Sequence, residues 1–343
     1  MFVVFAAGGC SLGPVKTELR YNPNVVFIDP TSGPVLISSS SNGQTFIHKT
    51  RNSSVDAPSC VKVDYLKLPF AVSSLPAMKC QLPNGKTYDL FIDTGFSEYY
   101  WMNELVVKEN DLAIYPITPT SSETQAGICY LPWLKFGDAT IVNPPARYQQ
   151  LHWEFRLLGV PLWQQKTLLM GLKSVLEFDH VIFDNKAGFV QFCSKSGKSG
   201  FEPPADEHWA SYKYTIEPDA SDNIRMMVEM PVAGQNRKVM FDTCGGYGLL
   251  VHPAVWRKMS KELGRPNFSK GTFITGFQGF LPCLKGDVDS LRLGDRIFKN
   301  ANIVVPDETT TYLGAVEVVL GMAYYKDSVM VIDNANKLLW IKG

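Results

Sequence analysis

The chain has 343 residues, of which 45% are hydrophobic, so it can bury one core of ordinary size or two smaller ones. Lysine and arginine together number 33, as do aspartate and glutamate, and the basic residues are scattered. This balance argues against nucleic acid or an acidic surface as a partner. The 20 phenylalanines and 14 tyrosines, in short alternating runs with valine and isoleucine and with many glycines and prolines, predict a mainly β protein with few short helices.

The N-terminal segment, residues 1–10, is a short apolar run that ends in small residues and Cys10. It is similar to a bacterial lipoprotein signal, in which a lipidated Cys10 would attach an exported, periplasmic protein to a membrane. No lysine or arginine precedes the run, and Ala7 stands where leucine is usual. A buried first strand, or a start codon assigned too far downstream, in a cytoplasmic protein is therefore the alternative. No run of 18 or more apolar residues occurs elsewhere, so a spanning helix is not expected.

Residues 11–60 have no counterpart later in the chain, and we expect an exposed N-terminal extension in which 24–29 and 34–39 could add strands. If Cys10 is lipidated, an even number of cysteines remains, which an oxidising compartment could pair in any of 15 ways. No Cys-x-x-Cys and no His/Cys spacing typical of zinc is present, so no metal is expected. The six remaining cysteines are Cys60, Cys80, Cys129, Cys193, Cys244 and Cys283.

Two phrases of the same pattern then follow, "DLFIDTGFSEYYW" around Asp93 and "KVMFDTCGGYGLL" around Asp242. Each sets Asp-Thr after an apolar, strand-like run and before a small residue and a turn. Short helices are predicted after each phrase, within 103–112 and 252–263. One Asp-Thr alone is ordinarily a turn or a helix cap, so the doubling carries the information.

Landmarks on both sides of the aspartates repeat in the same order, which indicates a duplicated architecture. The polar segment 194–208 contains glycine and proline, lacks apolar periodicity, and is predicted to link a lobe at 61–193 to a lobe at 209–343. The matched pairs are Asp93 and Asp242, Gly137 and Gly294, Gly171 and Gly321, and Asp184 and Asp333, at offsets of 149, 157, 150 and 149 residues.

Two facing carboxylates cannot both ionise cheaply, so they would share one proton and could activate a water molecule for peptide hydrolysis. We expect Thr94 and Thr243 to hydrogen-bond across this dyad. Gly171 and Gly321 would allow a strand to pass close behind each Asp loop. If the two motifs did not face each other, each lobe would instead act in a homodimer.

Over about 61–343 the motifs resemble those of aspartic proteases of the pepsin and retropepsin superfamily, with short lobes like two retropepsin subunits fused in one chain. The resemblance implies two pseudo-twofold-related β-barrel lobes, a monomer without cofactor, and a peptide or protein substrate bound extended between the lobes. By position, Asp93 and Asp242 match its catalytic dyad. Thr94 and Thr243 match its bracing threonines, and Gly95 matches its motif glycine.

In that superfamily, β-hairpin flaps close over the substrate, and we expect them within 124–133 and 275–284. Gly127 and Gly276 both follow their aspartates by 34 residues and are the candidate hairpin tips, with Tyr130 and Phe277 beside them. The alternative is that these residues only pack within strands.

Two departures from the family pattern lie beside the dyad. Cys244 replaces the second motif glycine, and Phe96 stands where pepsins often have serine and retropepsins alanine. Both carboxylates are kept, which favours an active aspartic endopeptidase. The alternative is a catalytically inactive peptide-binding protein of the cell envelope. A thiol protease based on Cys244 lacks a histidine at any supporting spacing.

Overall fold

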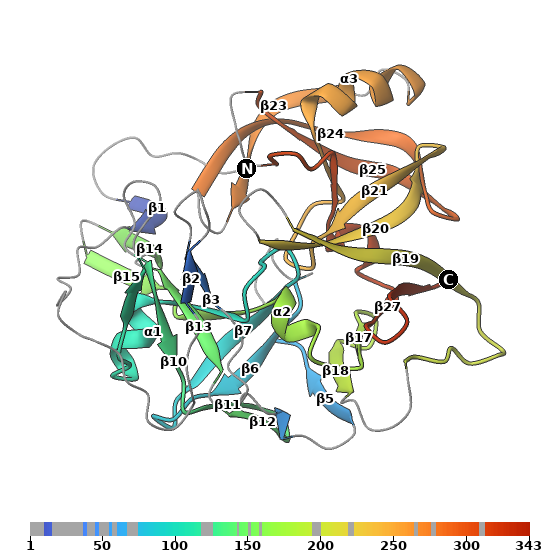
Figure 1. The fold of residues 1–343 in the computed structure, drawn as a ribbon. Helices are drawn as coiled ribbons and strands as arrows, with labels where there is room; N and C mark the ends of the chain where they lie inside the picture. The colour runs from blue at the N-terminus through green and yellow to red at the C-terminus, as the bar shows by residue number, and fades with distance from the viewer. Residues whose placement is uncertain are drawn as a thin grey trace.

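The structure, a computed structural model, describes most of the chain from residue 75 onward and short segments before it. Within the described residues the chain is mainly β, with few short helices, and forms two lobes (Figure 1). The prediction of a mainly β, two-lobed fold is confirmed. The described ranges are 10–15, 37–39, 45–47, 55–56, 60–66, 75–117, 126–142, 144–149, 152–157, 160–193, 200–218, 223–263, 267–275, 279–308 and 313–343.

The N-terminal lobe is built on a ten-stranded sheet in which β7 pairs in parallel with β16, and β8 in parallel with β13. β7 is a central strand and ends at Asp93, so this aspartate lies where the strand leaves the sheet. From one side of the sheet to the other, its strands are β4 (Val55–Asp56), β12 (Ala139–Val142), β11 (Trp133–Phe136), β6 (Ala77–Gln81), β7 (Thr87–Asp93), β16 (Thr167–Gly171), β8 (Tyr100–Asn103), β13 (Pro145–Gln149), β10 (Ala126–Tyr130) and β9 (Tyr115–Ile117).

The C-terminal lobe repeats this strand order. β21 pairs in parallel with β26, and β22 in parallel with β25, as β7 and β8 do with their partners. β20 and β21 therefore correspond to β6 and β7, and the hairpin β23–β24 corresponds to β9–β10. The strands in order are β20 (Ile224–Val232), β21 (Gln235–Phe241), β26 (Val318–Leu320), β22 (Leu249–Val251), β25 (Arg296–Pro306), β24 (Gly279–Leu293) and β23 (Asn267–Thr275).

Six strands join the two lobes. Three of them precede the predicted linker in the sequence and three follow it. At their centre β17 and β27 pair antiparallel, with His180 opposite Asp333 and Asp184 opposite Val329. The same sheet continues into the C-terminal lobe through β19, so backbone hydrogen bonds cross the boundary. In order the six are β5 (Cys60–Asp64), β18 (Phe189–Cys193), β17 (His180–Asp184), β27 (Val329–Asp333), β28 (Leu338–Lys342) and β19 (Trp209–Pro218).

Part of the N-terminal extension forms strands. β1 (Cys10–Val15) pairs antiparallel with β14 (His152–Leu157), which also pairs with β15 (Val160–Gln164). A separate pair is formed by β2 (Ile37–Ser39), within the predicted strand 34–39, and β3 (Thr45–Ile47). The other predicted strand, 24–29, lies outside the described residues. Cys10 is the first residue of β1 and pairs with Leu157.

The helices are short, and two of them, α1 and α3, lie within the ranges where the sequence predicts helices. α1 (Glu104–Glu109) is capped by Asn103, whose side chain accepts from the Val106 N–H at 3.2 Å. α3 (Pro253–Glu262) is capped by His252, and it buries Val255, Trp256 and Met259 against the C-terminal lobe. α2 (Leu172–Val175) and the 3-10 helix η2 (Met322–Tyr325) follow the matched glycines. None of the helices in the described ranges has the length and apolar character needed to span a bilayer.

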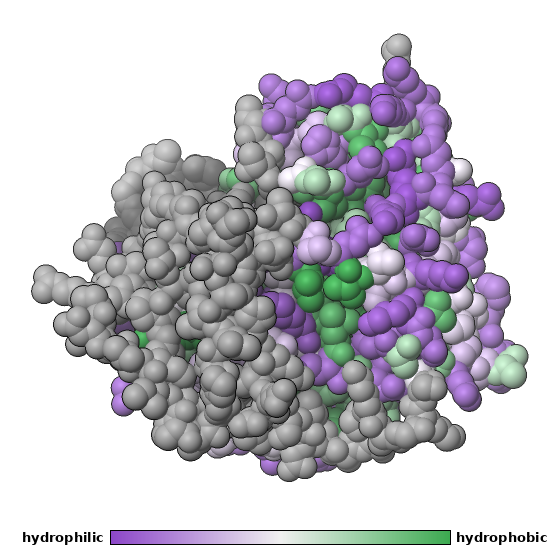
Figure 2. Space-filling view, in the orientation of Figure 1, coloured by the Kyte–Doolittle hydropathy of each residue, from purple (hydrophilic) through white to green (hydrophobic). Residues whose placement is uncertain are grey.

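One hydrophobic cluster of buried side chains extends through both lobes, and a smaller one lies beneath the β23–β24 hairpin. On the face shown in Figure 2, the described surface is mainly hydrophilic, with apolar residues gathered near the middle of the view. The two lobes therefore share one continuous hydrophobic core.

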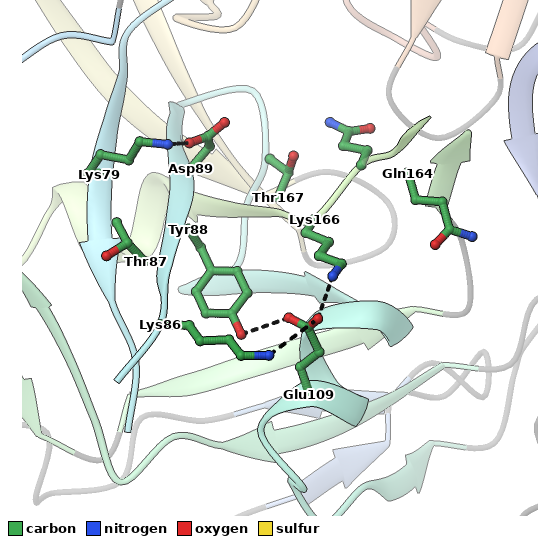
Figure 3. A pocket seen from close by; sticks show the side chains of 10 residues that line it. Lys79, Lys86, Thr87, Tyr88, Asp89, Glu109, Gln164, Lys166 and Thr167 are labelled. Carbon is green, nitrogen blue, oxygen red and sulfur yellow. Dashed lines mark hydrogen bonds and ion pairs between the residues drawn. The ribbon is translucent and has the colours of Figure 1, made fainter. Parts of the chain in front are cut away.

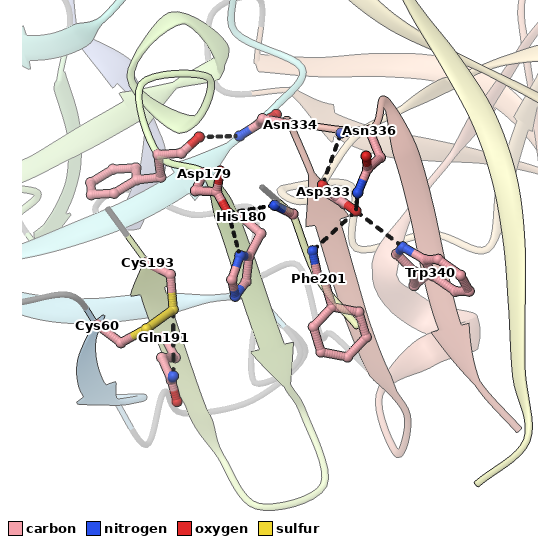
Figure 4. A network of polar contacts seen from close by, with 12 residues as sticks. Cys60, Asp179, His180, Gln191, Cys193, Phe201, Asp333, Asn334, Asn336 and Trp340 are labelled. Atoms are coloured by element: carbon pink, nitrogen blue, oxygen red, sulfur yellow. Dashed lines mark hydrogen bonds and ion pairs between the residues drawn. A yellow bond between two sulfur atoms is a disulfide. The ribbon is translucent and has the colours of Figure 1, made fainter. Parts of the chain in front are cut away.

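Buried carboxylates hold the middle of the predicted linker against the interlobe sheet (Figure 4). Asp179 accepts from the Gly200 N–H at 2.9 Å, and Asp333 accepts from the Phe201 N–H at 3.2 Å. Asp333 also accepts from Asn336 and from the Trp340 indole N–H. Because each of these aspartates comes from a different lobe, the chain at Gly200 and Phe201 is fixed to both.

A disulfide joins Cys60 of β5 to Cys193 of β18, where the two residues are direct partners in the sheet. It closes a loop across a sequence separation of 133 residues. Sequence alone left the pairing open. The other cysteines whose side chains the structure describes are free, namely Cys80, Cys129, Cys244 and Cys283.

We expect reduction of this disulfide to lower the free energy of unfolding by about 2–4 kcal/mol, because the cross-link restricts the unfolded chain over a long loop. Urea unfolding with and without reductant measures the change. The double variant Cys60→Ala/Cys193→Ala is the control, and it should start at the reduced value and ignore the reductant. An unfolding midpoint of the wild type that does not move with reductant would contradict the expectation.

Candidate active site

The two Asp-Thr loops meet at the junction of the lobes, with their carboxyl groups facing each other. A Cβ added to Gly95 would lie 2.9 Å from Asp242 Oδ1 and 3.1 Å from Asp93 Oδ1. The two carboxyl groups are close enough that each changes the pKa of the other. The alternative in which the two motifs do not face each other is therefore wrong.

The two threonines of these loops form a reciprocal set of hydrogen bonds across the junction. The Thr94 N–H donates to Thr243 Oγ1 and the Thr243 N–H to Thr94 Oγ1, both at 3.0 Å. In turn, the Thr94 hydroxyl donates to the Phe241 carbonyl at 2.8 Å and the Thr243 hydroxyl to the Ile92 carbonyl at 2.5 Å. Both threonines are buried, so each loop fixes the other in position.

Backbone donors hold each carboxylate in its own loop with the same geometry. The Gly95 N–H donates to Asp93 Oδ1 and the Cys244 N–H to Asp242 Oδ1, both at 2.9 Å. Cys244 therefore keeps the donor that the motif glycine supplies in the first copy. Its thiol lies 3.5 Å from the Ile92 carbonyl, to which it donates.

Gly171 and Gly321 lie directly behind the dyad loops. In the parallel pairing of β16 with β7, Gly171 is opposite Asp93. A Cβ on Gly171 would lie 2.1 Å from the Glu98 carbonyl oxygen, and a Cβ on Gly321 would lie 2.2 Å from the Tyr247 carbonyl oxygen. Any side chain at either position would therefore push the loop that carries its aspartate.

Burial and mutual repulsion shift the acidity of the dyad. Asp242 is buried and Asp93 is partly buried. Desolvation and the nearby Asp242 raise the pKa of Asp93 well above its ordinary value. Desolvation also raises the pKa of Asp242, although hydrogen bonds from Tyr247, the Cys244 N–H and Asp93 oppose the rise. The pair can therefore hold one proton across a wide pH range, which acid–base chemistry on water requires.

Sequence reasoning missed Tyr247, whose hydroxyl donates to Asp242 Oδ2 at 2.9 Å. The residue five positions after the other aspartate is Glu98, which instead forms an ion pair with Lys173 at 2.9 Å. Because the two copies differ here, the repeat gave no signal. A tyrosine within five residues of a candidate catalytic aspartate was the available hint.

One flap candidate, Gly127, does not lie at the hairpin tip where the offset of 34 residues placed it. Gly127 and Tyr130 belong to β10, which pairs with β9 on one side and β13 on the other, so the prediction of Gly127 as a hairpin tip is wrong. The described ends of β9 and β10 are Ile117 and Ala126, which pair directly, and residues 118–125 lie outside the described residues. Gly276 and Phe277 lie outside the described residues, between Thr275 and Gly279, which are partners in the β23–β24 hairpin.

A surface pocket of about 550 Å³ lies at the other end of β7 from Asp93 (Figure 3). Its charged side chains are paired with one another: Lys79 with Asp89, and both Lys166 and Lys86 with Glu109, to which Tyr88 also donates at 3.0 Å. In the described part of the chain, no group of three or more His, Cys, Asp or Glu side chains is arranged to hold a metal ion. Among the described residues, the facing carboxyl groups of Asp93 and Asp242 are therefore the arrangement suited to acid–base chemistry.

We expect the Cys244 thiol to react slowly with iodoacetamide in the folded protein. Burial and the negative charge of Asp93 and Asp242 raise its pKa well above the ordinary value, so little thiolate forms at pH 8. Labelling followed by peptide mass spectrometry should show modification at least about tenfold slower than for the same cysteine after unfolding in urea. Equal rates in the folded and unfolded protein would contradict this picture of the site.

No protein-family model and no curated protein sequence matches the chain. Among solved structures, an aspartic proteinase from Irpex lacteus is similar over 82% of this chain and 97% of its own, with 11% identity and a TM-score of 0.48. A protein named edgp covers 83% of this chain and 95% of its own, at 10% identity and a TM-score of 0.44. Basic 7S globulin from soybean is similar over 83% of this chain and 94% of its own, with 9% identity and a TM-score of 0.43. Because these identities and TM-scores are low, the function is argued below from the geometry of Asp93 and Asp242.

Proposed function

We propose that this chain is an aspartic-type endopeptidase of the pepsin and retropepsin superfamily, with two retropepsin-like lobes in one chain. The observation that carries the proposal is the facing pair of carboxyl groups of Asp93 and Asp242. Reciprocal threonine hydrogen bonds brace this pair from both sides. A turn or cap aspartate needs neither a partner carboxylate nor such bracing.

In the proposed reaction, the ionised carboxylate takes a proton from a water held between the two groups. As the water attacks, the protonated carboxyl gives its proton to the oxygen of the scissile carbonyl, and a tetrahedral diol forms. The proton taken from water then passes from the dyad to the departing nitrogen, and a diol hydroxyl returns its proton to the dyad as the C=O bond re-forms and the C–N bond breaks. One carboxyl is again protonated and the other ionised, so the cycle closes without a covalent intermediate.

We propose that the substrate is an extended peptide held between the lobes beneath the hairpins β9–β10 and β23–β24. The two hairpins occupy corresponding places in the two sheets, and each has an outer strand at a sheet edge. At the described end of the second hairpin, Ile274 and Phe280 are paired neighbours with 63% and 46% of their surface exposed. Exposed apolar side chains at this position suit contact with apolar residues of a substrate.

We also propose export of a monomeric protein with a lipid on Cys10. The disulfide between Cys60 and Cys193 supports an oxidising compartment. Metabolic labelling with a radioactive fatty acid tests this directly, with Cys10→Ser as the unlabelled control. Labelling of both proteins, or of neither, would overturn the lipid attachment.

The test of the proposed enzyme is cleavage of a mixed peptide library between pH 3 and 8 in water enriched in ¹⁸O. We expect one labelled oxygen in the new carboxylate and inhibition by a statine-type diol mimic at one inhibitor per chain. Binding of the diol mimic without cleavage of any peptide would replace this proposal with the catalytically inactive, peptide-binding alternative. If the protein neither binds the diol mimic nor cleaves a peptide, both the enzyme and the peptide-binding alternative are refuted.

A further inference from the structure

Each dyad loop lays one aromatic ring against the glycine behind it, but only one ring carries a hydroxyl. In the first copy, Phe96 Cδ1 lies 2.8 Å from the position that a Cβ on Gly171 would take. In the second copy, Tyr247 Cδ2 lies 2.9 Å from the corresponding position on Gly321. The ring on Gly321 thus brings a hydroxyl to Asp242, whereas the ring on Gly171 has no hydroxyl to offer.

The hydroxyl of Tyr247 gives Asp242 a donor that Asp93 lacks. Asp242 accepts from the Cys244 N–H at Oδ1 and from Tyr247 Oη at Oδ2, both at 2.9 Å, so both oxygens are occupied. Asp93 accepts from the Gly95 N–H at Oδ1. The Phe96 backbone also lowers the pKa of Asp93, as the Gly245 backbone lowers that of Asp242, so the Tyr247 hydroxyl is the difference between the two. A carboxylate with more donors is stabilised in its charged form, because these bonds are stronger to an ion than to a neutral acid.

We propose that Tyr247 is a positioning residue that makes Asp242 the ionised, water-activating carboxylate and leaves the shared proton on Asp93. The inference rests on the proposed function, and it assigns the base and the acid within that function. A dyad with symmetrical surroundings would leave this choice to the substrate.

The Tyr247 ring is held firmly enough to direct its hydroxyl. It packs against the small hydrophobic cluster beneath the β23–β24 hairpin. A Cβ on Gly245 would lie 2.9 Å from Tyr247 Cζ, so the ring also lies directly on this glycine. A donor fixed by packing before the reaction loses little entropy when it stabilises a charge.

The other titratable group that faces the dyad in the described residues is Cys244. Burial and both aspartates raise the pKa of its thiol, so it is neutral and does not compete with Tyr247 for the charge. The direction of the acidity shifts agrees with the geometry. The pKa of Asp93 is raised by burial and by Asp242, whereas Tyr247 is the largest influence that lowers the pKa of Asp242.

The test compares Tyr247→Phe, which removes one oxygen atom, with Tyr324→Phe. Tyr324 lies in the same lobe and donates to the Asn302 carbonyl at 2.6 Å, so its variant controls for the loss of a partly buried hydroxyl. Carbon-13 NMR of labelled aspartate carboxyls follows the ionisation of each residue, with Asp93→Asn and Asp242→Asn providing the assignments. The readout does not need turnover.

We expect Asp242 to ionise before Asp93 in the wild type, and its titration to move up by about one pH unit in Tyr247→Phe. Tyr324→Phe should leave it in place, and the acid limb of kcat/KM should move with Asp242. If Tyr247→Phe does not fold, Tyr247→Met fills the same space without a donor and should show the same shift.

An unmoved Asp242 titration in the donor-free variant, or ionisation of Asp93 first in the wild type, would overturn the assignment. If the titration shifts as expected but the wild type cleaves no peptide, the assignment stands and the proposed enzyme fails. If peptides are cleaved and the acid limb stays fixed, the enzyme stands and the role of Tyr247 fails.

Discussion

Asp93→Asn is expected to abolish peptide hydrolysis and, at neutral pH, to make the fold more stable. The amide cannot exchange a proton with water or with Asp242, and general acid–base catalysis of this kind contributes up to about 10⁴-fold. The amide oxygen can still accept from the Gly95 N–H, which now donates to Asp93 Oδ1 at 2.9 Å. We therefore expect kcat to fall at least about 10³-fold with the loop unmoved.

The gain in stability follows from the raised pKa of Asp93. Between the unfolded pKa, about 3.9, and the higher folded value, the folded state binds more protons than the unfolded state. The contribution of Asp93 to stability is therefore most favourable at acid pH and falls as the pH rises through this interval. Above it, the wild type carries the whole destabilisation, and asparagine removes it. The expected gain at pH 7 is on the order of 1 kcal/mol.

Urea unfolding at pH 4 and pH 7 measures this gain, which should be smaller at pH 4. Asp184→Asn is the matched control, because Asp184 is a half-buried aspartate at the end of β17, outside the dyad loops, and accepts from the Ala187 N–H at 2.8 Å. A variant less stable than the wild type at both pH values would contradict the account, as would retained hydrolysis.

The features predicted from sequence are those in which a local motif carries its own chemistry. Asp93 and Asp242 follow strands, and Thr94 and Thr243 come next, so one strand-to-turn pattern places four groups of the site. The helices after them could also be predicted, since their caps and apolar spacing are local. A repeat of such motifs then implies the two-lobed arrangement.

Features that depend on where a side chain points could not be predicted. Tyr247 contributes to the dyad because its ring lies on Gly321, and no sequence spacing encodes that direction. The partner of Cys60 depends on which strand lies beside β5. The equal spacing of Gly127 and Gly276 from their aspartates was misleading, because the arms of the two hairpins differ in length: β9 has 3 residues and β23 has 9.

The second large effect is expected from adding one methyl group at Gly171 or Gly321. In either variant the new Cβ would overlap a backbone carbonyl oxygen, that of Glu98 at 2.1 Å or that of Tyr247 at 2.2 Å. Backbone cannot rotate away as a flexible side chain can, so the strand or the dyad loop must shift. We expect each variant to lose at least about 3 kcal/mol of unfolding free energy, from a total of about 5–15.

Gly246→Ala provides the control for these two variants. It lies in the same loop as Asp242, yet the atom nearest to its added Cβ is Leu75 Cδ2 at 4.0 Å, an ordinary contact. Its stability should change by no more than about 0.5 kcal/mol. Thermal unfolding of the three variants therefore separates close approach behind the loop from a general intolerance of alanine near the dyad.

The two glycine variants also test whether the lobes contribute equally to the site. Gly171→Ala displaces the loop of Asp93, and Gly321→Ala displaces the loop of Asp242 together with Tyr247, but the threonines couple the two loops. A displacement of either loop should therefore weaken binding of a diol mimic, which needs both carboxyls at once. Tight binding by one variant and not by the other would mean that the loops move independently, and that the reciprocal threonine hydrogen bonds do not hold the dyad together.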